Sequence, residues 1–307
     1  MTLKNFKRAS ARYGLFTTSW LIAKLPYGLV KVVTHGLLFI GFHLTVKLKR
    51  VARETLALAF RGEKDEQETR RIIRECFTHF GRGMIEMIYY TAHPERAAAK
   101  FRIEGKEHLD RALSEGRGAV AVTAHFGNFP LMMLALAQMG YPVNCVIRET
   151  RDPHIRDHVF KNMTKTKVKP IYTLPRKACV NNCLAALRNN EILFMLLDQN
   201  FGSAGGVFVD FFGRKAATAT GPVVLAGRAQ ALILPMFVVR QEGDFHKIFI
   251  EPPRAIEPRG NGNDKIAAHV SELTRVIETY IRRYPQEWGW MHRRWKTRKP
   301  EGGEHVH

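Results

Sequence analysis

From residue 101 onward, short apolar runs alternate with amphipathic stretches. Runs such as GAVAVTA (118–124) are rich in small and β-branched residues, which is typical of strands buried on both faces of a parallel sheet. The stretches between the runs repeat their apolar positions with helical spacing. This alternation predicts an α/β domain, with a mostly parallel central sheet and helices on both of its faces.

Strands are expected at 101–105, 118–124, 143–148, 191–197, 231–240 and 246–253, with a short extended segment at 206–213. Helices are expected at 106–116, 129–139, 154–163, 179–190, 220–230 and 263–284. Two more amphipathic helices are expected before the first strand, at 49–60 and 64–91.

The N-terminal region has a different pattern, in which basic residues are interleaved with apolar runs at 14–23 and 37–46. Neither run reaches the 18 or so apolar residues of a clear spanning helix. No small-residue cleavage site follows the first run, so a removed signal peptide is not expected. The interleaving favours a segment that lies in or dips into an anionic leaflet. One imperfect span over 19–46, and an amphipathic helix packed on the domain's own core, are the alternatives.

We therefore divide the chain into a membrane-anchoring segment with an N-terminal membrane-associated helix (1–50), an α/β domain (51–298) and a flexible tail (299–307). The tail contains His305 and His307, which we interpret as frayed residues rather than metal ligands.

The chain is strongly basic: 48 lysines and arginines against 28 acidic residues leave a net charge of +20. Such an excess indicates an anionic partner, which is nucleic acid, a phospholipid surface, or an acidic substrate or carrier protein. No nucleic-acid recognition module, Walker loop, dinucleotide fingerprint or zinc-protease motif is found. We therefore expect no nucleic acid, no metal and no nucleotide cofactor. The four cysteines lack zinc-ribbon spacing, which favours buried thiols over a metal or redox role.

The best candidate site is the segment from His125 to Pro130, where a buried strand ends and a helix begins. Ligands of open α/β sheets bind at the carboxyl ends of strands. A helix N-terminus disfavours the imidazolium, so His125 would stay neutral and act as a base. Backbone N–H groups around Gly127 and Asn128 would stabilise an oxyanion, and Pro130 suits a first helical turn. A structural histidine at the strand end is the alternative.

Two further strand ends carry polar residues: Arg148 after one, and Asp198 and Gln199 after another. In a parallel sheet these side chains would meet the histidine at one edge. Arg148 and Asp198 are further catalytic candidates: Arg148 could bind a phosphate or carboxylate bidentately, or orient the site. Gln199 is a candidate substrate contact. The alternatives are a surface ion pair of Arg148 with Asp152 or Glu149, and a helix-capping or structural role for Asp198.

The stretch 288–299 combines three tryptophans with cationic side chains. Interleaved aromatic and basic residues are typical of contacts with lipid headgroups, phosphorylated ligands or single-stranded nucleic acid. Arg293, Arg294 and Lys296 are therefore candidate substrate-binding residues. A solvated basic face would explain the charges but not the tryptophans.

Together these segments resemble the late acyltransferases of lipid A biosynthesis, the lauroyl/myristoyl family. The segments that carry the resemblance are AHFGNF (124–129), VIRETRDP (146–153), LLDQN (196–200), GVFVDFFGRKAATATGP (206–222) and PQEWGWMHRRWKTR (285–298). The resemblance covers essentially the whole chain. In addition, ALILPMFV (231–238) is similar to the closing strand motif of the wider glycerolipid acyltransferases.

The resemblance implies a glycerol-phosphate acyltransferase-like fold and an enzyme on the cytoplasmic face of the inner membrane. Such an enzyme transfers a fatty acyl chain from acyl carrier protein to a hydroxyl of an anionic lipid A precursor, without a further cofactor. Both partners are acidic, in agreement with the basic chain. The alternatives are an acyltransferase for another membrane lipid, such as a lysophospholipid or ornithine lipid, and a non-catalytic relative that binds lipid or carrier.

One position departs from the family pattern, which places Asp or Glu five positions after the histidine. Here that position is Pro130. Either another carboxylate serves, with Asp198, Asp152 and Glu149 as candidates, or His125 works alone, or activity is lost. Such a carboxylate fixes the imidazole tautomer and stabilises the imidazolium.

Overall fold

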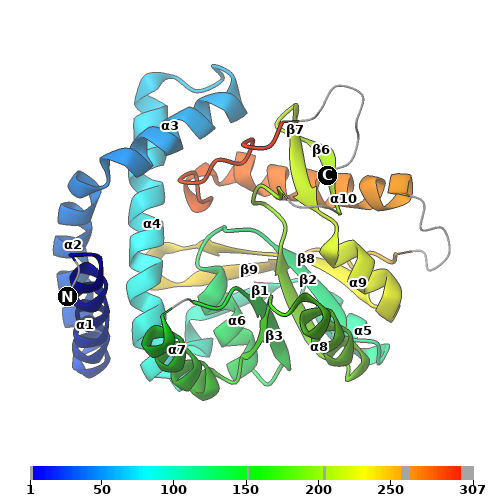
Figure 1. The fold of residues 1–307 in the computed structure, drawn as a ribbon, viewed down its shortest axis with the longest axis horizontal. Helices are drawn as coiled ribbons and strands as arrows, with labels where there is room; N and C mark the ends of the chain where they lie inside the picture. Colours follow the sequence, from blue (N-terminus) through cyan, green and yellow to red (C-terminus); the bar gives the residue numbers. More distant parts are fainter. Residues whose placement is uncertain (1–2, 151, 203–204, 257–262, 299–307) are drawn as a thin grey trace.

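The computed structural model describes residues 3–150, 152–202, 205–256 and 263–298 (Figure 1). The expected tail at 299–307, with its two histidines, lies outside these residues.

A seven-stranded sheet forms the centre of the molecule, in the order β1-β9-β8-β2-β5-β3-β4. Five neighbouring strands run parallel, while β9 is antiparallel to β8 and β1 pairs with β9. The predicted mostly parallel sheet is confirmed, with two reversed strands at one edge. The strands span β1 Phe101–Glu104, β2 Ala119–Thr123, β3 Val143–Ile147, β4 Lys169–Tyr172, β5 Ile192–Leu196, β8 Leu232–Arg240 and β9 His246–Ile250.

Helices cover both faces of this sheet, as predicted. Alternate residues of β2 belong to different cores: Val120 and Val122 pack on one side, and Ala119 and Ala121 on the other. The first core is covered by α8, α9 and α10, and the second by α5 and α6. The helices span α5 Lys106–Ser114, α6 Phe129–Gln138, α7 Pro153–Thr166, α8 Arg176–Arg188, α9 Gly221–Ala229 and α10 Asn263–Arg283.

The extended segment expected at 206–213 is one arm of an antiparallel hairpin outside the main sheet. Strands β6 (Gly206–Phe211) and β7 (Arg214–Ala219) are joined at Phe212 and Gly213, both with positive φ. The hairpin lies above α10 in Figure 1 and packs on it.

Four helices precede the sheet: α1 Leu3–Lys24, α2 Tyr27–Leu44, α3 Val46–Phe60 and α4 Glu66–Ala92. Figure 1 shows α4 between the α1–α2 pair and the sheet. The expected boundary at residue 50 falls inside α3, so the N-terminal helices are continuous with the domain.

The single imperfect span over 19–46 is wrong, because the chain breaks between two helices at Pro26, whose ring leaves no N–H for a continuous helix. Instead α2 is by itself long and apolar enough to cross a membrane, with 18 residues and a mean hydropathy of 1.4. Only Val30 and Thr34 of α2 are buried. Large apolar side chains such as Phe39, which is 70% exposed, lie on its open surface.

Candidate active site

The sheet brings two predicted site residues together at the carboxyl ends of neighbouring parallel strands. The last paired residues of β2 and β5, Thr123 and Leu196, lie side by side. His125 and Asp198 each follow two positions later, and the His125 Nδ1 atom is 2.9 Å from Asp198 Oδ1. The meeting of strand ends that the sequence predicts is therefore found for this pair.

Asp198 is fully buried and ionised. Burial alone would raise the pKa of this carboxyl, but His125, with smaller contributions from His292 and the Trp288 indole N–H, lowers it from 3.8 to about 2. An ionised carboxylate can only accept hydrogen bonds. The Nδ1 atom of His125 must therefore be the donor, which leaves a lone pair on Nε2. This is the tautomer that a general base needs.

The free nitrogen of His125 points to the open side of the site. The imidazole is 31% exposed, and the exposed Gln199 donates its amide N–H to Nε2 over 3.1 Å. Gln199 is therefore the exposed side chain that contacts this nitrogen of His125.

The backbone around Gly127 is held by the C-terminal segment. The Gly127 N–H donates to the Glu287 carbonyl at 2.7 Å, and the Gly289 N–H donates to the His125 carbonyl at 2.9 Å. A Cβ atom on Gly127 would lie 2.0 Å from the Val238 carbonyl oxygen. Glycine is therefore required here by the approach of β8 rather than by a substrate. The Gly127 amide that the sequence assigned to an oxyanion is already engaged.

Asn128 is a buried cap of α6. Its Oδ1 accepts from the Leu131 N–H, while its amide group donates to Glu86 Oε2 at 3.0 Å and to the Gly83 carbonyl at 3.3 Å. Its backbone N–H makes no hydrogen bond within the described part of the chain. Of the two expected oxyanion donors, this amide is the one that is free. Pro130 occupies the first turn of α6, as expected.

Arg148 directly follows β3 and is exposed. The ion pairs considered for it do not form: Glu149 lies 3.7 Å from Arg156, while Asp152 caps α7 and lies 3.9 Å from Arg12. Neither carboxylate contacts His125. Asp198 is thus the carboxylate that supplies the partner missing at position 130.

Part of the C-terminal aromatic and basic stretch belongs to the core, so its interpretation as a headgroup surface is wrong for Trp288, Trp290 and Arg294. Trp288, Trp290 and Arg294 are all 0% exposed. The Arg294 guanidinium donates to the Ala217 carbonyl at 2.6 Å and to the Thr218 hydroxyl, and its burial lowers its pKa to about 10. Arg294 thus ties the C-terminal segment to the β6–β7 hairpin and does not face a substrate.

The other two cations predicted to bind substrate, Arg293 and Lys296, are exposed. Arg293 lies 3.7 Å from Glu54 on α3, whereas Lys296 has no ion pair among the residues described here. Both remain candidate substrate contacts.

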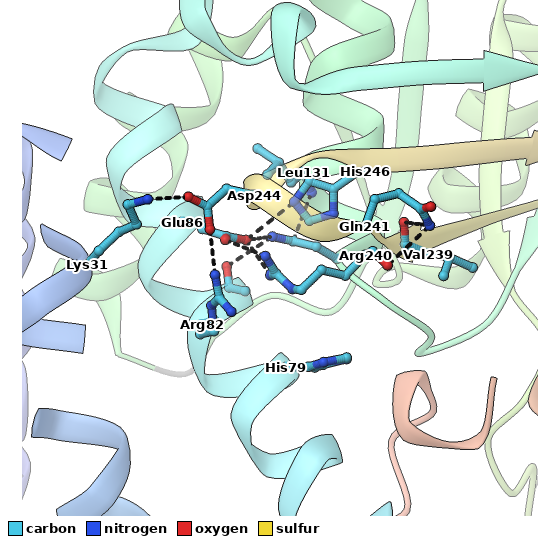
Figure 2. A network of polar contacts seen from close by, with 12 residues as sticks. Lys31, His79, Arg82, Glu86, Leu131, Val239, Arg240, Gln241, Asp244 and His246 are labelled. Atoms are coloured by element: carbon cyan, nitrogen blue, oxygen red, sulfur yellow. Dashed lines mark hydrogen bonds and ion pairs between the residues drawn. The ribbon is translucent and has the colours of Figure 1, made fainter. Parts of the chain in front are cut away.

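Two parts of the site were missed at the sequence level. One is the Trp288 indole, whose Nε1–H donates to Asp198 Oδ2 at 2.8 Å. The other is the network of Figure 2, in which Glu86 of α4 accepts two hydrogen bonds of 2.7 Å from Arg240 and one from Asn128. No local signal predicts either, because both join segments that are far apart in the chain.

The network of Figure 2 continues to α2. Asp244, in the turn between β8 and β9, accepts from Arg82 of α4 at 2.5 Å and from Lys31 of α2 at 2.6 Å. Burial would raise the pKa of Glu86, but His246 and Arg240 lower it to about 2. The N-terminal helices are thus joined by fixed charges to the start of α6.

The described residues contain no group of three or more His, Cys, Asp or Glu side chains that could hold a metal ion. The four cysteines are free thiols, and all but the partly buried Cys179 are buried.

Comparison with known proteins shows that this protein is an acyltransferase. Residues 7–297 match the model of the bacterial lipid A biosynthesis acyltransferases, and the chain belongs to this family. It is 28% identical to the lipid A biosynthesis lauroyltransferase of Escherichia coli K12, over 92% of this chain and 90% of that protein. It is also 28% identical to the palmitoleoyltransferase of the same strain, over 91% and 89%.

Among solved structures, the 1-acyl-sn-glycerophosphate acyltransferase of Thermotoga maritima is 13% identical and overlaps with a TM-score of 0.39. The match covers 78% of this chain and 96% of that one. An overlap this loose adds nothing to the family membership.

Proposed function

We propose that the protein transfers a fatty acyl chain from acyl carrier protein to a hydroxyl of a lipid A precursor, with His125 as general base. The observation that supports the proposal most is the His125–Asp198 pair, which a chain of this family presents at the carboxyl edge of its sheet. The pair fixes the tautomer and leaves Nε2 to receive a proton.

The reaction proceeds without an acyl-enzyme. The acceptor hydroxyl displaces the Gln199 amide from His125 Nε2. Nε2 then takes the proton of this hydroxyl as its oxygen attacks the thioester carbonyl. The backbone N–H of Asn128 donates to the developing oxyanion. When the tetrahedral intermediate collapses, the carbon–sulfur bond breaks and the carrier thiolate takes the proton from the His125 imidazolium. Asp198 stays ionised throughout and stabilises that imidazolium.

The charge and surface of the chain support the proposed partners. A net charge of +20 favours an acidic carrier protein and an anionic lipid, and exposed cations such as Arg148 and Lys296 are available to contact them. The open apolar surface of α2 favours attachment to a membrane. We place the enzyme on the cytoplasmic face of the inner membrane, where carrier protein and precursor would meet.

The test is acyl transfer from labelled acyl carrier protein to a purified lipid A precursor in detergent micelles. Wild type, His125→Ala and the control His154→Ala, which removes an exposed histidine of α7, are compared. We expect wild type and the control to transfer equally and His125→Ala to lose about 10²- to 10⁴-fold in kcat.

Each other outcome removes one part of the proposal. Full activity of His125→Ala would show that another group is the base. Label that passes to a lysophospholipid or ornithine lipid, and not to the lipid A precursor, would change the acceptor. Transfer from an acyl-coenzyme A thioester but not from acyl carrier protein would change the donor.

A further inference from the structure

We propose that Trp288 is a positioning residue for acyl transfer: its indole N–H holds the Asp198 carboxylate so that Oδ1 faces the His125 imidazole. The inference rests on the proposed role of His125 as base, and it assigns a part of the reaction to a residue of the C-terminal segment.

The two oxygens of Asp198 have different partners. Oδ1 accepts from His125 Nδ1 at 2.9 Å, while Oδ2 accepts from the His125 backbone N–H at 2.9 Å and from Trp288 Nε1 at 2.8 Å. The last torsion of an aspartate has a broad, two-fold preference, so the carboxylate plane is fixed only by its hydrogen bonds. Two donors on Oδ2 therefore determine where Oδ1 points.

Of those two donors, the indole is the one that is independent of the catalytic residue. The other belongs to the backbone of His125 and moves with the imidazole. An indole N–H is also a donor only, so it cannot exchange roles with the carboxylate when protons move. Trp288 therefore holds the Asp198 carboxylate through a side chain that does not belong to the segment from His125 to Asn128.

The indole itself is fixed by its surroundings. Trp288 is 0% exposed, and its backbone pairs with Phe126 in an antiparallel bridge beside the catalytic histidine. Its ring meets the rings of Trp290 and Phe211 edge-on, with centroid separations of 4.6 Å and 5.7 Å. A ring packed in this way cannot turn without displacing its neighbours. The direction of the N–H bond is thus set by the core.

A change in the donor should be visible in the pH dependence of the reaction. Without the indole N–H, the Asp198 carboxylate becomes a stronger acceptor for the Nδ1–H of the imidazolium, which favours protonated His125. The acid limb of the kcat/KM profile, which reports the free enzyme's base, should then move to higher pH. A purely structural tryptophan would not move that limb.

Trp290 is the matched control. It is also 0% exposed, and its Nε1–H donates to the Pro285 carbonyl at 2.6 Å instead of to a carboxylate. Trp288→Phe and Trp290→Phe each remove one buried indole and one hydrogen bond. We expect both to lower the melting temperature, and Trp288→Phe alone to lower kcat about 10- to 100-fold with the acid limb displaced. Equal losses with both profiles unchanged would overturn the inference.

A second measurement does not depend on whether Trp288→Phe folds. In the full chain labelled with ¹⁵N-tryptophan, four indole signals are expected. The signal that Asp198→Asn perturbs most should shift with pH as the imidazole titrates, and His125→Ala should abolish that shift. An indole signal of Trp288 that is indifferent to both variants would overturn the inference.

The failures of the two proposals are distinguishable. Full activity of His125→Ala removes the proposed base and this inference with it. An inactive His125→Ala, combined with a Trp288→Phe profile identical to that of Trp290→Phe, removes the role of Trp288 alone.

Discussion

Two buried carboxylates, Asp198 and Glu86, contact the segment from His125 to Asn128, and their ionisable partners differ in exposure. Each is at most 5% exposed, and each has a pKa lowered to about 2. Glu86 is bonded twice to Arg240, a permanent cation whose side chain is only 7% exposed. Asp198 is bonded to a backbone amide, an indole and an imidazole that is 31% exposed.

The difference shows which buried carboxylate can take part in proton chemistry. The charge of Arg240 does not change at any physiological pH. The imidazole partner of Glu86, His246, is only 2% exposed, so the Glu86 group acts on structure. The imidazole can gain and lose a proton at Nε2 while Asp198 remains ionised. A lowered pKa alone does not distinguish the two, whereas the exposure of the imidazole partner does: His125 is 31% exposed and His246 is 2% exposed.

The largest effect is expected from Asp198→Asn. An asparagine side chain can place its amide group against Nδ1 and stabilise the wrong imidazole tautomer, so kcat should fall about 10³- to 10⁴-fold. Glu86→Gln is the comparison variant, and its folded fraction should lose far less activity. Acyl-transfer rates normalised to folded protein measure both. If the Asp198→Asn enzyme is as active as Glu86→Gln, Asp198 has no larger role in proton transfer than Glu86.

A large effect on stability is expected from Arg240→Met. This change leaves the Glu86 charge buried without its cation, and the free energy of unfolding should fall by about 3–5 kcal/mol. The double variant Glu86→Gln/Arg240→Met removes both charges and should recover most of that loss. Lys31→Ala breaks a partly exposed pair and should change stability by about 0–1 kcal/mol. Denaturant titrations measure all three, and a double variant no better than Arg240→Met would contradict the account.

A smaller, graded effect is expected from acid. The native pKa values of Asp198 and Glu86 lie below their ordinary values of 3.8 and 4.5. The unfolded chain therefore binds protons first as the pH falls, and stability is lost from the range of those ordinary values down to about pH 2. Glu86→Gln should flatten the dependence of unfolding free energy on pH below 5, as should Asp198→Asn. Curves parallel to the wild type would show that other groups dominate acid unfolding.

The smallest effects are expected at the exposed cations. Arg148→Ala and Lys296→Ala should raise KM for the acidic substrates by up to about fivefold, because solvated charge pairs contribute no more than about 1 kcal/mol. The increase should shrink as salt screens the wild-type interaction. Arg293→Ala, which also removes a cation close to Glu54, should have a weaker effect. KM values unchanged at low salt would exclude these side chains from substrate binding.

The sequence could place Asp198 among three candidate partners of His125, with Asp152 and Glu149, because all three carboxylates lie after the ends of predicted strands. Strand and helix periods identify the strand ends, and a parallel sheet collects those ends at one edge. The same reasoning placed Gly127 near a substrate, but the approach of Val238 could not be seen, since it depends on how β8 lies.

The role of Arg294 could not be predicted, because the sequence of residues 288–299 is compatible both with a solvated surface and with a buried core. Arg294 reaches Ala217, 77 residues away, and Arg240 reaches Glu86, 154 residues away. Only the packing of the β6–β7 hairpin and of α4 decides that these arginines are buried. Basic residues near tryptophans therefore indicate a lipid surface only when their side chains are known to be exposed.

The bridge between Phe126 and Trp288 also has a consequence for biosynthesis, because it joins two segments that are far apart in the chain. During translation His125 emerges from the ribosome before Asp198, and Asp198 emerges before Trp288. The helices at the N-terminus leave the ribosome before any of them. The N-terminal helices can therefore leave the ribosome while this arrangement is incomplete, and the contacts among His125, Asp198 and Trp288 form only after Trp288 has emerged. A ribosome that stalls before Trp288 leaves a chain that contains the histidine without the segment that holds it.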